Sequence, residues 1–418
     1  MLTQPNDPIR RIALVSVHGC PLAHPGTRST GGMNVYLKVL APLLAQSGIC
    51  VDVFTRAHDM EDAALATLGP RARVVHLPAG PLGLSKEEVF DVLPRFLEQV
   101  SSFAADEGLG YDLVHSHYWL SGWIGHRLAE SWGVPHVVTF HTLALVKQSV
   151  NGSAEHPERG RVERELSRSA DATIVFTPGE QEALVDLYGA SPSRIHVAPG
   201  GVDLDQFRPL DKLAARQRLG FNPDDQLVLY VGRLDPFKGT DVLLHAFREL
   251  TLPNKRLAIV GGEGQNDPEA ARLWRLAEEL GIASSVHWQR AIPHDQLGDY
   301  YNAADVYTMP SYHESFGLAA LEAMACGTPV VAARVGALSL LVLDRRTGRL
   351  VDDHTPAAFA RSLEATLSDA ELLRRLGHGA REWAQQFPWS RAARAVLDVY
   401  GRTVALVGSR AAVAPCRG

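Results

Sequence analysis

Short runs of apolar residues alternate with longer amphipathic stretches through the first half of the chain. The first apolar run spans 11–17 (RIALVSV), and after a proline-containing loop an amphipathic stretch extends from Gly31-Gly32 to about Gln46. Such apolar runs are typical of strands buried on both faces of a parallel sheet, and amphipathic stretches are typical of the helices that cover it. The pattern predicts further strands at 50–55, 74–77, 113–116, 136–140, 172–176 and 195–197, and helices at 86–103, 120–131, 160–169 and 179–187.

A second alternation follows the polar segment 205–225, whose charges and prolines are typical of a linker between domains. It predicts strands at 227–231, 257–260, 286–288, 306–309 and 330–331, and helices from 240, at 270–280 and 294–303, and from near 317. An apolar stripe predicts a last helix at 388–408, which we expect to pack back across the first domain. This order of elements indicates an α/β fold with two Rossmann-like, doubly wound parallel-sheet domains. We place them at 1–205 and 206–387, with the last helix and a tail at 388–418.

Composition narrows the function classes. A length of 418 residues suits two or three domains, and a net charge of −6 gives no overall electrostatic attraction to nucleic acid or to an anionic membrane. The first ten residues are polar and lack the apolar core of a signal peptide, and no apolar run is long enough to span a bilayer. We therefore expect a cytoplasmic protein. The cysteines, Cys20, Cys50, Cys326 and Cys416, lack metal-site spacing, so we predict reduced thiols and no metal.

Polar residues follow several of the predicted strands directly. His18 follows the first strand, His117-Tyr118 follows the strand at 113–116, and His141-Thr142 follows the strand at 136–140. Ligands of doubly wound sheets bind beyond the carboxyl ends of the strands. A single histidine there is more often a loop or core residue, but three at corresponding strand ends favour a site.

Glycines and cations at two strand-to-helix turns suit phosphate groups. Gly31-Gly32 begins the first predicted helix, and a glycine pair there lets a phosphate approach the helix N-terminus, although it can also serve only the turn. Arg233 and Lys238 follow the strand at 227–231 and form a compact cationic pair. Such a pair suits a diphosphate, and structural salt bridges are the alternative.

Two glutamates stand eight residues apart near the end of the second domain. Glu314 lies in a loop before the helix that begins near Gly317, and Glu322 lies two turns into that helix. This spacing prevents them from forming a close acid–base pair, but it allows them to hold two parts of one long ligand. The alternative is a solvated loop glutamate and an ordinary helix-surface glutamate.

Together, the two Rossmann-like domains, the glycine pair, the Gly232-Arg233 and Lys238 loop and the Glu314/Glu322 spacing resemble the retaining GT-B glycosyltransferases of family 4. The likeness covers nearly the whole chain. It is most similar to the branch of mycothiol biosynthesis, which moves N-acetylglucosamine from UDP to 1L-myo-inositol 1-phosphate. The stretches that carry this similarity are GGMNVY (31–36), AGPLGLSKEE (79–88), HSHYWLSG (115–122), HTLALVK (141–147) and GRLDPFKG (232–239). The resemblance implies two domains that face a cleft and close over the donor, and a homodimer.

The resemblance also implies a role for individual residues on the donor side. Arg233 and Lys238 would bind the donor diphosphate, and the amide of Gly32 would contact its β-phosphate. The sugar hydroxyls would be held by Glu314 and by the backbone after Phe316, at Gly317 and Leu318, while Glu322 would hold the ribose and His141 would lie near the sugar 6-hydroxyl. The catalytic set is then His141, Arg233, Lys238 and Glu314, with no metal and no cofactor besides the UDP-sugar substrate.

On the acceptor side, the resemblance places Asn34 at the inositol ring, and Lys86, Tyr118, Thr142 and Arg159 around its phosphate. Two cations and two hydroxyls suit a phosphomonoester dianion. The sequence departs from the family pattern in four places: Ser29 replaces an acidic residue, Gly336-Ala337 replaces two glycines, the loop before Arg159 is short, and the segment 343–346 is unusually basic.

The resemblance implies front-face substitution, in which the leaving diphosphate accepts the proton of the acceptor hydroxyl. Arg233, Lys238 and helix N-termini would then stabilise the negative charge that develops on UDP. Alternatives within the family are a fructose 6-phosphate acceptor, as in sucrose-phosphate synthase, or a cyclitol acceptor of antibiotic biosynthesis, with UDP-glucose as another donor. A silent nucleotide-sugar-binding subunit would lack Arg233, Lys238 or Glu322, and an NAD-dependent enzyme would carry a Gly-x-Gly-x-x-Gly turn at the first strand. Neither condition is met.

Overall fold

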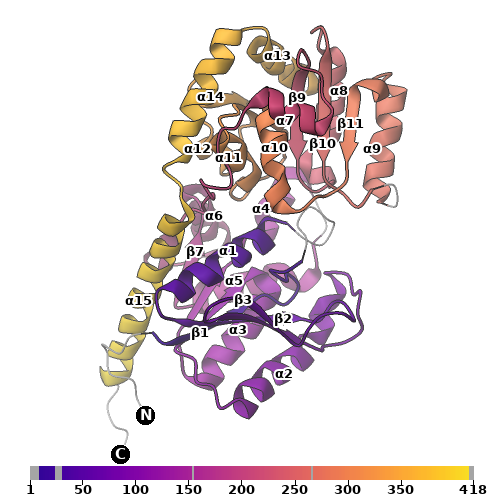
Figure 1. Ribbon diagram of the computed structural model, residues 1–418. Helices are drawn as coiled ribbons and strands as arrows, with labels where there is room; N and C mark the ends of the chain where they lie inside the picture. The colour runs from indigo at the N-terminus through magenta and orange to yellow at the C-terminus, as the bar shows by residue number, and fades with distance from the viewer. Residues whose placement is uncertain (1–8, 24–30, 153–154, 265–266, 414–418) are drawn as a thin grey trace, which may run out of the picture. The chain divides into compact units, whose positions relative to one another are not determined.

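The computed structural model of the chain describes residues 9–23, 31–152, 155–264 and 267–413 (Figure 1). It divides into two compact units. The N-terminal unit consists of the first strand, residues 33–199 and the final helix from Ser390, and the C-terminal unit consists mainly of residues 200–389. Each unit contains one sheet with helices on both faces, which is the predicted doubly wound α/β architecture.

Among the described residues, the N-terminal unit has an eight-stranded sheet in the order β3-β4-β2-β1-β5-β6-β7-β8. Only β3 runs antiparallel to its neighbour, and the other pairs are parallel. The central strands are buried on both faces, which explains the apolar sequence of β1, whereas β5 also buries the polar residues His115, Ser116 and His117. The strands are β1 (Arg11–Val15), β2 (Cys50–Arg56), β3 (Leu65–Gly69), β4 (Ala72–Leu77), β5 (Leu113–His117), β6 (His136–Thr139), β7 (Ala172–Val175) and β8 (Ile195–Val197).

Helix α1 covers one face of this sheet, and α2 and α3 cover the other (Figure 1). The apolar sides of α2 and α3 form one buried cluster with β1, β4 and β5. The helices of this unit are α1 (Gly32–Gln46), η1 (Glu88–Val92), α2 (Leu93–Asp106), α3 (Tyr118–Trp132), α4 (Ala144–Asn151), α5 (Pro157–Ser169), α6 (Pro178–Tyr188), η2 (Pro192–Arg194) and α15 (Trp389–Val413).

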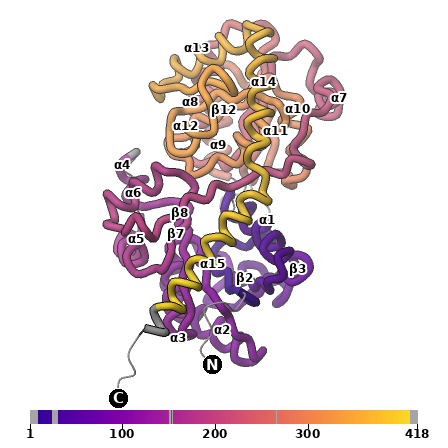
Figure 2. The backbone as a smooth tube through the Cα atoms, turned by 90° about the vertical axis from the view of Figure 1, so that its left-hand side faces the viewer, coloured from indigo at the N-terminus to yellow at the C-terminus, as the bar shows by residue number. Residues whose placement is uncertain are grey.

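The last helix, α15, lies along the N-terminal unit (Figure 2). Its predicted apolar stripe is buried at Ala392, Val396 and Tyr400, and the Tyr400 hydroxyl is 2.6 Å from Nδ1 of the buried His115 on β5. Of the helices in the described part of the chain, none has both the length and the apolar character needed to cross a membrane. Cys20, Cys50 and Cys326 are free thiols, and Cys416 lies outside the described residues.

The C-terminal unit has, within its described residues, a six-stranded parallel sheet in the order β11-β10-β9-β12-β13-β14. Helices α8, α9 and α13 contribute to the same buried apolar cluster on one side of it. The strands are β9 (Gln226–Val231), β10 (Lys255–Val260), β11 (Val286–Gln289), β12 (Val306–Met309), β13 (Val330–Ala333) and β14 (Gly348–Val351). The helices are α7 (Lys212–Leu219), η3 (Pro236–Lys238), α8 (Thr240–Glu249), α9 (Pro268–Glu279), η4 (Ala283–Ser285), η5 (His294–Gln296), α10 (Leu297–Ala303), α11 (Leu318–Ala325), α12 (Leu338–Leu341), α13 (Pro356–Leu367) and α14 (Ala370–Ala384).

Several local predictions were wrong. The segment predicted as a linker contains α7, because Arg216 bonds the Ala303 carbonyl and the Asp305 carboxylate and so ties a polar stretch to the unit. The helix predicted from 86 starts later, as η1 followed by α2, and Pro94 stands in the first turn of α2, where its missing N–H costs nothing. Strands β3 and β14 and helices α4, α12, α13 and α14 were not predicted.

The strand order of each sheet reverses at one point, between β1 and β5 in the N-terminal unit and between β9 and β12 in the C-terminal unit. Ligands of open α/β sheets bind beyond the carboxyl ends of strands at such a point. The residues that follow β1, β5 and β6, and those that follow β9 and β12, are therefore the ones to examine for a site.

Candidate functional site

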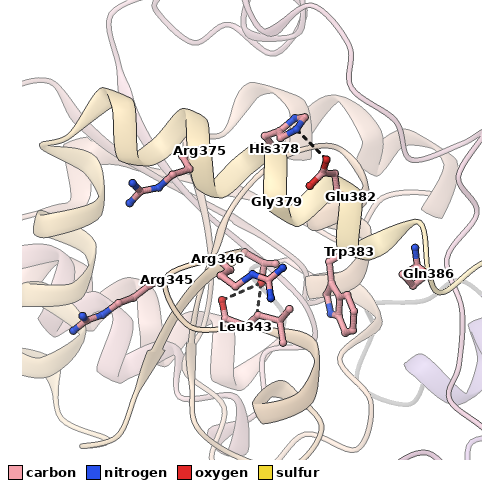
Figure 3. Close-up of a pocket in the computed structure, with 10 residues that line it drawn as sticks. Leu343, Arg345, Arg346, Arg375, His378, Gly379, Glu382, Trp383 and Gln386 are labelled. Carbon is pink, nitrogen blue, oxygen red and sulfur yellow. Dashed lines mark hydrogen bonds and ion pairs between the residues drawn. The ribbon is translucent and has the colours of Figure 1, made fainter.

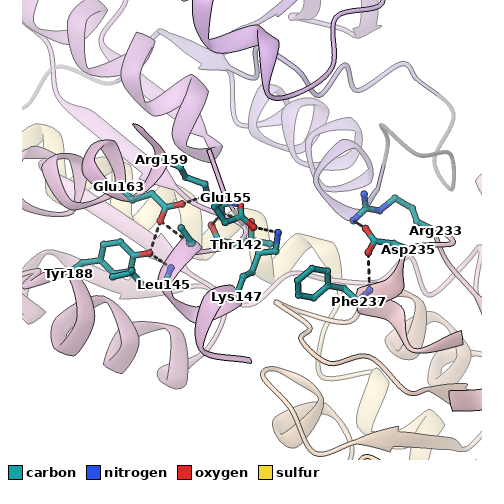
Figure 4. Close-up of polar contacts among 11 residues, drawn as sticks. Thr142, Leu145, Lys147, Glu155, Arg159, Glu163, Tyr188, Arg233, Asp235 and Phe237 are labelled. Atoms are coloured by element: carbon teal, nitrogen blue, oxygen red, sulfur yellow. Dashed lines mark hydrogen bonds and ion pairs between the residues drawn. The ribbon is translucent and has the colours of Figure 1, made fainter. Parts of the chain in front are cut away.

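In the C-terminal unit, the loop after β9 is fixed by its own turn. The Asp235 carboxylate accepts a hydrogen bond from the Phe237 amide at 2.9 Å, and Arg233 lies 3.9 Å from the other Asp235 oxygen (Figure 4). Gly239 has a φ of +65°, and a Cβ there would lie 2.1 Å from the carbonyl oxygen of Pro310. Only glycine permits this approach of the loop to the end of β12, which sets the position of Lys238.

Lys238 and Glu314 form an ion pair at the carboxyl ends of β9 and β12. The Lys238 ammonium donates to Glu314 Oε2 at 2.6 Å, and the two side chains are 20% and 15% exposed. Burial raises the pKa of the Glu314 carboxyl, but the Lys238 ammonium outweighs burial, so the net pKa lies below its ordinary value. The pair thus presents a fixed cation and a fixed carboxylate to a ligand.

The loop that carries Glu314 leads into the N-terminus of α11. Gly317 precedes this helix with a φ of +86°, and the first turn of α11 contains no acidic side chain to compensate its free amides. The Ala337 amide donates to the Glu314 carbonyl at 3.0 Å, and a Cβ at Gly336 would lie 2.1 Å from that oxygen. The pair Gly336-Ala337, which differs from the family pattern, therefore supports the backbone of Glu314.

Glu322 is buried, so the alternative of an ordinary helix-surface glutamate is wrong. Its side chain accepts hydrogen bonds from His294 Nε2 at 2.7 Å and from the Tyr301 hydroxyl at 2.8 Å. Since a carboxylate cannot donate, the His294 proton on this contact is on Nε2. These two hydrogen bonds hold the Glu322 carboxylate in one orientation. A carboxylate that binds two vicinal hydroxyls needs such a fixed orientation.

In the N-terminal unit, two neighbouring strands end in residues with unusual backbone conformations. Tyr118 directly follows β5 with a φ of +77°, and His141 follows β6 with a φ of +61°. Positive φ is disfavoured for residues with a Cβ, and such strain persists where the surrounding structure imposes it, often at functional sites. Two such residues on adjacent strands mark this edge of the sheet as a candidate site.

His141 is held by a second histidine and by α1. Its Nε2 lies 3.0 Å from Nδ1 of His117, the last residue of β5, and its ring meets the Tyr36 ring edge-on at 5.5 Å. Burial lowers the pKa of His141 to about 3, and burial also lowers the pKa of His117 well below its ordinary value. Both imidazoles are neutral near pH 7, so one donates the hydrogen bond and the other accepts it.

Two cations lie over the Tyr118 ring. The Lys86 ammonium is 4.0 Å and the Arg159 guanidinium is 4.8 Å from the ring centroid, both within cation–π distance. The Tyr118 side chain is buried, and the ring of His18 lies 4.7 Å from it. Residues from the turn before η1, from α3 and from α5 thus gather beyond the end of β5.

Arg159 is buried and strongly engaged within its own unit (Figure 4). Its Nε donates to Glu163 at 2.6 Å, one terminal nitrogen donates to Glu155 at 2.6 Å, and the other donates to the carbonyl and hydroxyl of Thr142 at 2.8 and 2.9 Å. Glu163 also accepts from the Tyr188 hydroxyl at 2.6 Å. Arg159 therefore supports the segment of Thr142, and a phosphate would have to share or replace Glu155.

The remaining predicted residues lie on α1. Gly32 is its first residue, and Asn34, in the first turn, is buried and donates from Nδ2 to the Cys20 carbonyl at 2.8 Å. Asn34 therefore links α1 to the loop after β1. Ser29, one of the departures from the family pattern, lies outside the described residues.

The structure groups the predicted residues into two clusters, one in each unit. The C-terminal cluster contains Arg233, Lys238, Glu314, Phe316, Gly317, Leu318 and Glu322, and the N-terminal cluster contains Asn34, Lys86, Tyr118, His141, Thr142 and Arg159. Sequence reasoning missed the side chains that hold them. His294 opens a predicted helix after a proline, which was a usable signal, whereas Tyr301 and Glu163 looked like ordinary helix residues.

Among the described residues, no group of three or more histidine, cysteine, aspartate or glutamate side chains has the arrangement of a metal site. The polar groups of the two clusters are cations, hydroxyls, neutral imidazoles and single carboxylates. Such groups can bind phosphates and sugar hydroxyls by charge-assisted hydrogen bonds.

Two family models match the chain. The model described as Glycosyltransferase Family 4 matches residues 30–206, and the model described as Glycosyl transferases group 1 matches residues 211–383. A protein named D-inositol 3-phosphate glycosyltransferase 2 from Catenulispora acidiphila is 45% identical over 407 residues, which cover 94% of this chain and 95% of that protein. A D-inositol 3-phosphate glycosyltransferase from Mycobacteroides abscessus is 44% identical, over 95% of this chain and 90% of that protein.

Solved structures are similar over the same length. Sucrose-phosphate synthase from Thermosynechococcus elongatus is 37% identical with a TM-score of 0.87, over 94% of this chain and 98% of that one. Anabaena HepE, solved with UDP and glucose, is 20% identical with a TM-score of 0.74, over 93% and 98%. This second likeness bears on the fold alone. Together with the two parallel-sheet units, these neighbours confirm the predicted GT-B fold.

Proposed function

This chain belongs to glycosyltransferase family 4, and we propose that it transfers N-acetylglucosamine from UDP-N-acetylglucosamine to 1L-myo-inositol 1-phosphate, with retention at the anomeric carbon. The observation that carries the proposal is its 45% identity, over 94% of its length, to a protein named for D-inositol 3-phosphate, which is the same compound under another name. The enzyme class, a glycosyltransferase, follows from the family itself.

The C-terminal cluster supplies the donor half of the proposal. Arg233 and Lys238 bind the diphosphate, and the backbone amides of Phe316, Gly317 and Leu318, at the start of α11, face the same negative charge and the sugar hydroxyls. The Lys238 ammonium has three N–H donors and uses one of them on Glu314. It can therefore contact a donor phosphate and the Glu314 carboxylate at the same time. In this proposal, these side chains rather than a metal compensate the charge on the leaving group.

The reaction then needs little proton chemistry from the protein. The bond between the sugar C1 and the diphosphate oxygen breaks, the bond between C1 and the acceptor oxygen forms on the same face, and the leaving phosphate oxygen takes the hydroxyl proton. Glu314 is a poor nucleophile because its carboxylate is tied to Lys238 at 2.6 Å. The neutral His141 contributes a hydrogen bond to the sugar, so it orients the donor without changing its charge.

Glu322 provides a test of the ribose contact. We expect Glu322→Gln to raise the KM for the UDP-sugar by about tenfold to a hundredfold, because it replaces a charge-assisted hydrogen bond with a neutral one. The neighbours His294 and Tyr301 keep a partner in this variant. Initial rates at varied donor concentration measure the effect, and Glu364→Gln, a glutamate of the same unit bonded to Thr251, is the matched control. An unchanged donor KM would remove Glu322 from the ribose site.

The N-terminal cluster supplies the acceptor half. Lys86, with Tyr118 and Thr142, would receive the phosphate, and Asn34 would meet the inositol ring. Arg159 takes part by holding Thr142 in place through bonds to its carbonyl and hydroxyl, and it can contact the phosphate directly only if its bond to Glu155 breaks. The tight network of Arg159, Glu163 and Tyr188 supports the first role over the second.

We expect Lys86→Ala to raise the KM for the phosphorylated acceptor by about tenfold to a hundredfold, which is the range for one hydrogen bond to a charged group. The donor KM should stay within about twofold, since Lys86 lies in the acceptor cluster. Lys38→Ala removes another exposed lysine, from α1, and should change neither constant. If Lys86→Ala affects donor and acceptor equally, Lys86 is not a specific phosphate contact.

The complete reaction is tested by UDP release from UDP-N-acetylglucosamine and from UDP-glucose, each with inositol 1-phosphate, fructose 6-phosphate and free inositol. The proposal expects turnover with UDP-N-acetylglucosamine and inositol 1-phosphate, and at least about tenfold less with free inositol, which lacks the charged group. A preference for free inositol would refute the phosphate site.

The same assay separates a second candidate. The likeness to sucrose-phosphate synthase, at 37% identity and a TM-score of 0.87, favours UDP-glucose and fructose 6-phosphate as substrates. The inositol relatives are more similar in sequence, at 45%, so we place this candidate second. Preferred turnover of the fructose 6-phosphate pair would reverse the order.

We extend the proposal to a homodimer in the cytoplasm. Support for the dimer comes from the family resemblance, and support for the compartment comes from the intracellular supply of UDP-sugars. Light scattering during size-exclusion chromatography measures the molar mass of the assembly. The mass of a monomer, at the enzyme concentration of the assay, would contradict the proposed homodimer.

A further inference from the structure

A pocket of about 380 Å³ lies in the C-terminal unit between the loop at 343–347 and helix α14 (Figure 3). We propose that it binds a phosphomonoester, such as a phosphorylated sugar, at a place distinct from the proposed donor and acceptor residues. None of those residues lines the pocket. The residues that carry the argument are Arg345, Arg346, Arg375, His378, Gly379 and Trp383.

The loop is a rigid support for two arginines. Its amides are bonded within the loop and to the next strand: Arg346 N donates to the Leu343 carbonyl at 2.9 Å, and Arg345 N donates to the Gly348 carbonyl at 2.8 Å. Arg345 has a φ of +61°, a conformation that an arginine adopts only where the surroundings impose it. The buried Thr347 closes the loop, because its hydroxyl accepts from the Leu343 amide at 2.9 Å. The backbone that carries the two arginines is thus fixed before a ligand arrives.

Helix α14 is adapted to receive this loop. A Cβ at Gly379 would lie 2.2 Å from the carbonyl oxygen of Arg346, so only glycine allows the loop to approach the helix this closely. The approach brings the basic segment, which departs from the family pattern, against Arg375 and His378 of α14. In the view of Figure 3, Arg345 and Arg375 extend on the same side, and Arg346 lies between them and Trp383.

The pocket carries a clear excess of positive charge. The Glu382 carboxylate is bonded to His378 at 3.1 Å, and Arg345 lies 3.9 Å from Asp344. Within the described residues, Arg346 and Arg375 have neither an ion pair nor a side-chain hydrogen bond. Guanidinium groups present paired donors that match phosphate oxygens, so a dianion is the ligand that this charge pattern fits.

The pocket has room for more than a bare ion. Its volume lies within the range of about 300 to 1,000 Å³ that small-molecule sites show. Trp383 forms part of the wall, and its buried indole N–H has no partner among the described residues. An aromatic wall suits the face of a sugar ring. We therefore assign the arginines to the phosphate and Trp383 to the organic body.

Calorimetric titration of the full-length protein with glucose 6-phosphate, inorganic phosphate and glucose tests the assignment. The wild type should bind glucose 6-phosphate at least about tenfold more tightly than either fragment, because phosphate and body both contribute. Arg346→Ala/Arg375→Ala should lose at least about tenfold in affinity for glucose 6-phosphate. The matched control is Arg374→Ala, which removes the adjacent arginine, paired with Glu371 and outside the pocket.

A phosphate site elsewhere in the protein would bind the ligand equally in all three proteins, so equal titrations would overturn the proposal. Absence of binding to the wild type at millimolar concentration would also overturn it. Both substituted arginines are exposed, and thermal melting of each variant verifies that the fold is kept. Trp383→Phe provides a second measurement, since it should weaken the binding of glucose 6-phosphate but leave the binding of inorganic phosphate unchanged. If the variant weakens the binding of both ligands, or of neither, the role of the indole is refuted.

Discussion

Lys238→Ala is expected to lower turnover by about two to three orders of magnitude, the scale on which a preorganised charge stabiliser acts. In the proposed reaction the Lys238 ammonium compensates the charge that develops on the leaving diphosphate, and its hydrogen bond to Glu314 at 2.6 Å fixes its position. The variant also leaves the Glu314 carboxylate without its cation, so the pKa of Glu314 should rise toward the value that burial favours. Arg233→Ala should show a loss of similar size.

The matched control is Lys212→Ala. Lys212 forms an ion pair with Asp305 at 2.9 Å in the same unit, so it tests whether loss of a lysine–carboxylate pair alone reduces turnover. Single-turnover rates at saturating donor separate the chemical step from substrate binding. Turnover near that of the wild type in both Lys238→Ala and Arg233→Ala would exclude the charge-stabilising role.

Acidification from pH 7.5 to pH 5.5 is expected to reduce the contribution of three buried histidines to the free energy of unfolding by about 4 kcal/mol in total. His115, His117 and His136 are at most 2% exposed, and burial lowers the pKa of His136 to about 3 and those of the other two well below their ordinary value. The charges of neighbouring histidines add to the effect.

The direction follows from proton uptake. In the unfolded chain these histidines bind protons near pH 6.5, whereas in the folded protein they stay neutral to a much lower pH. Their contribution to stability is complete above about pH 6.5 and is lost as the pH falls toward the folded pKa values. Between pH 7.5 and pH 5.5 each histidine lowers the free energy of unfolding by roughly 1 to 2 kcal/mol, and the three together give the total.

Urea unfolding at a series of pH values measures this loss. His136→Asn should lower the number of protons taken up on unfolding at pH 5.5 by about one, because one buried group is removed. His378→Ala, at an exposed position, should leave the pH dependence unchanged. The same unfolding free energy at pH 5.5 and pH 7.5 would show that the buried histidines do not control acid stability.

Much of the fold was predictable because buried parallel strands leave a local signal. The stretches at 12–15 and 227–231 are apolar without interruption, and both form central strands beside a reversal of strand order. By contrast, β3 is an edge strand, and most of its residues are only partly buried, so its sequence, LATLG, lacks that signal. The helix α7 was missed because its stability depends on contacts of Arg216 far along the chain.

The candidate site was predictable where a residue type matches a chemical task at a strand end. Lys238 and Glu314 were found in this way, and the structure places them in contact. The support of the site was not predictable, since the bonds of Glu322 to His294 and Tyr301 join residues up to 28 positions apart. The strained backbone of His141 was equally hidden, because tertiary contacts rather than local sequence impose it.

The position of α15 sets an order in which the protein can be completed during synthesis. The buried Tyr400 of α15 supplies the partner of His115 on β5, so the N-terminal unit requires a segment that is synthesised after the whole C-terminal unit. At about 5 to 20 residues per second, the region from 200 to 390 takes roughly ten to forty seconds to synthesise. During that interval the face that α15 covers stays open to water. This unit is thus the first to begin folding and the last to finish, and chaperones have that time in which to bind its apolar face.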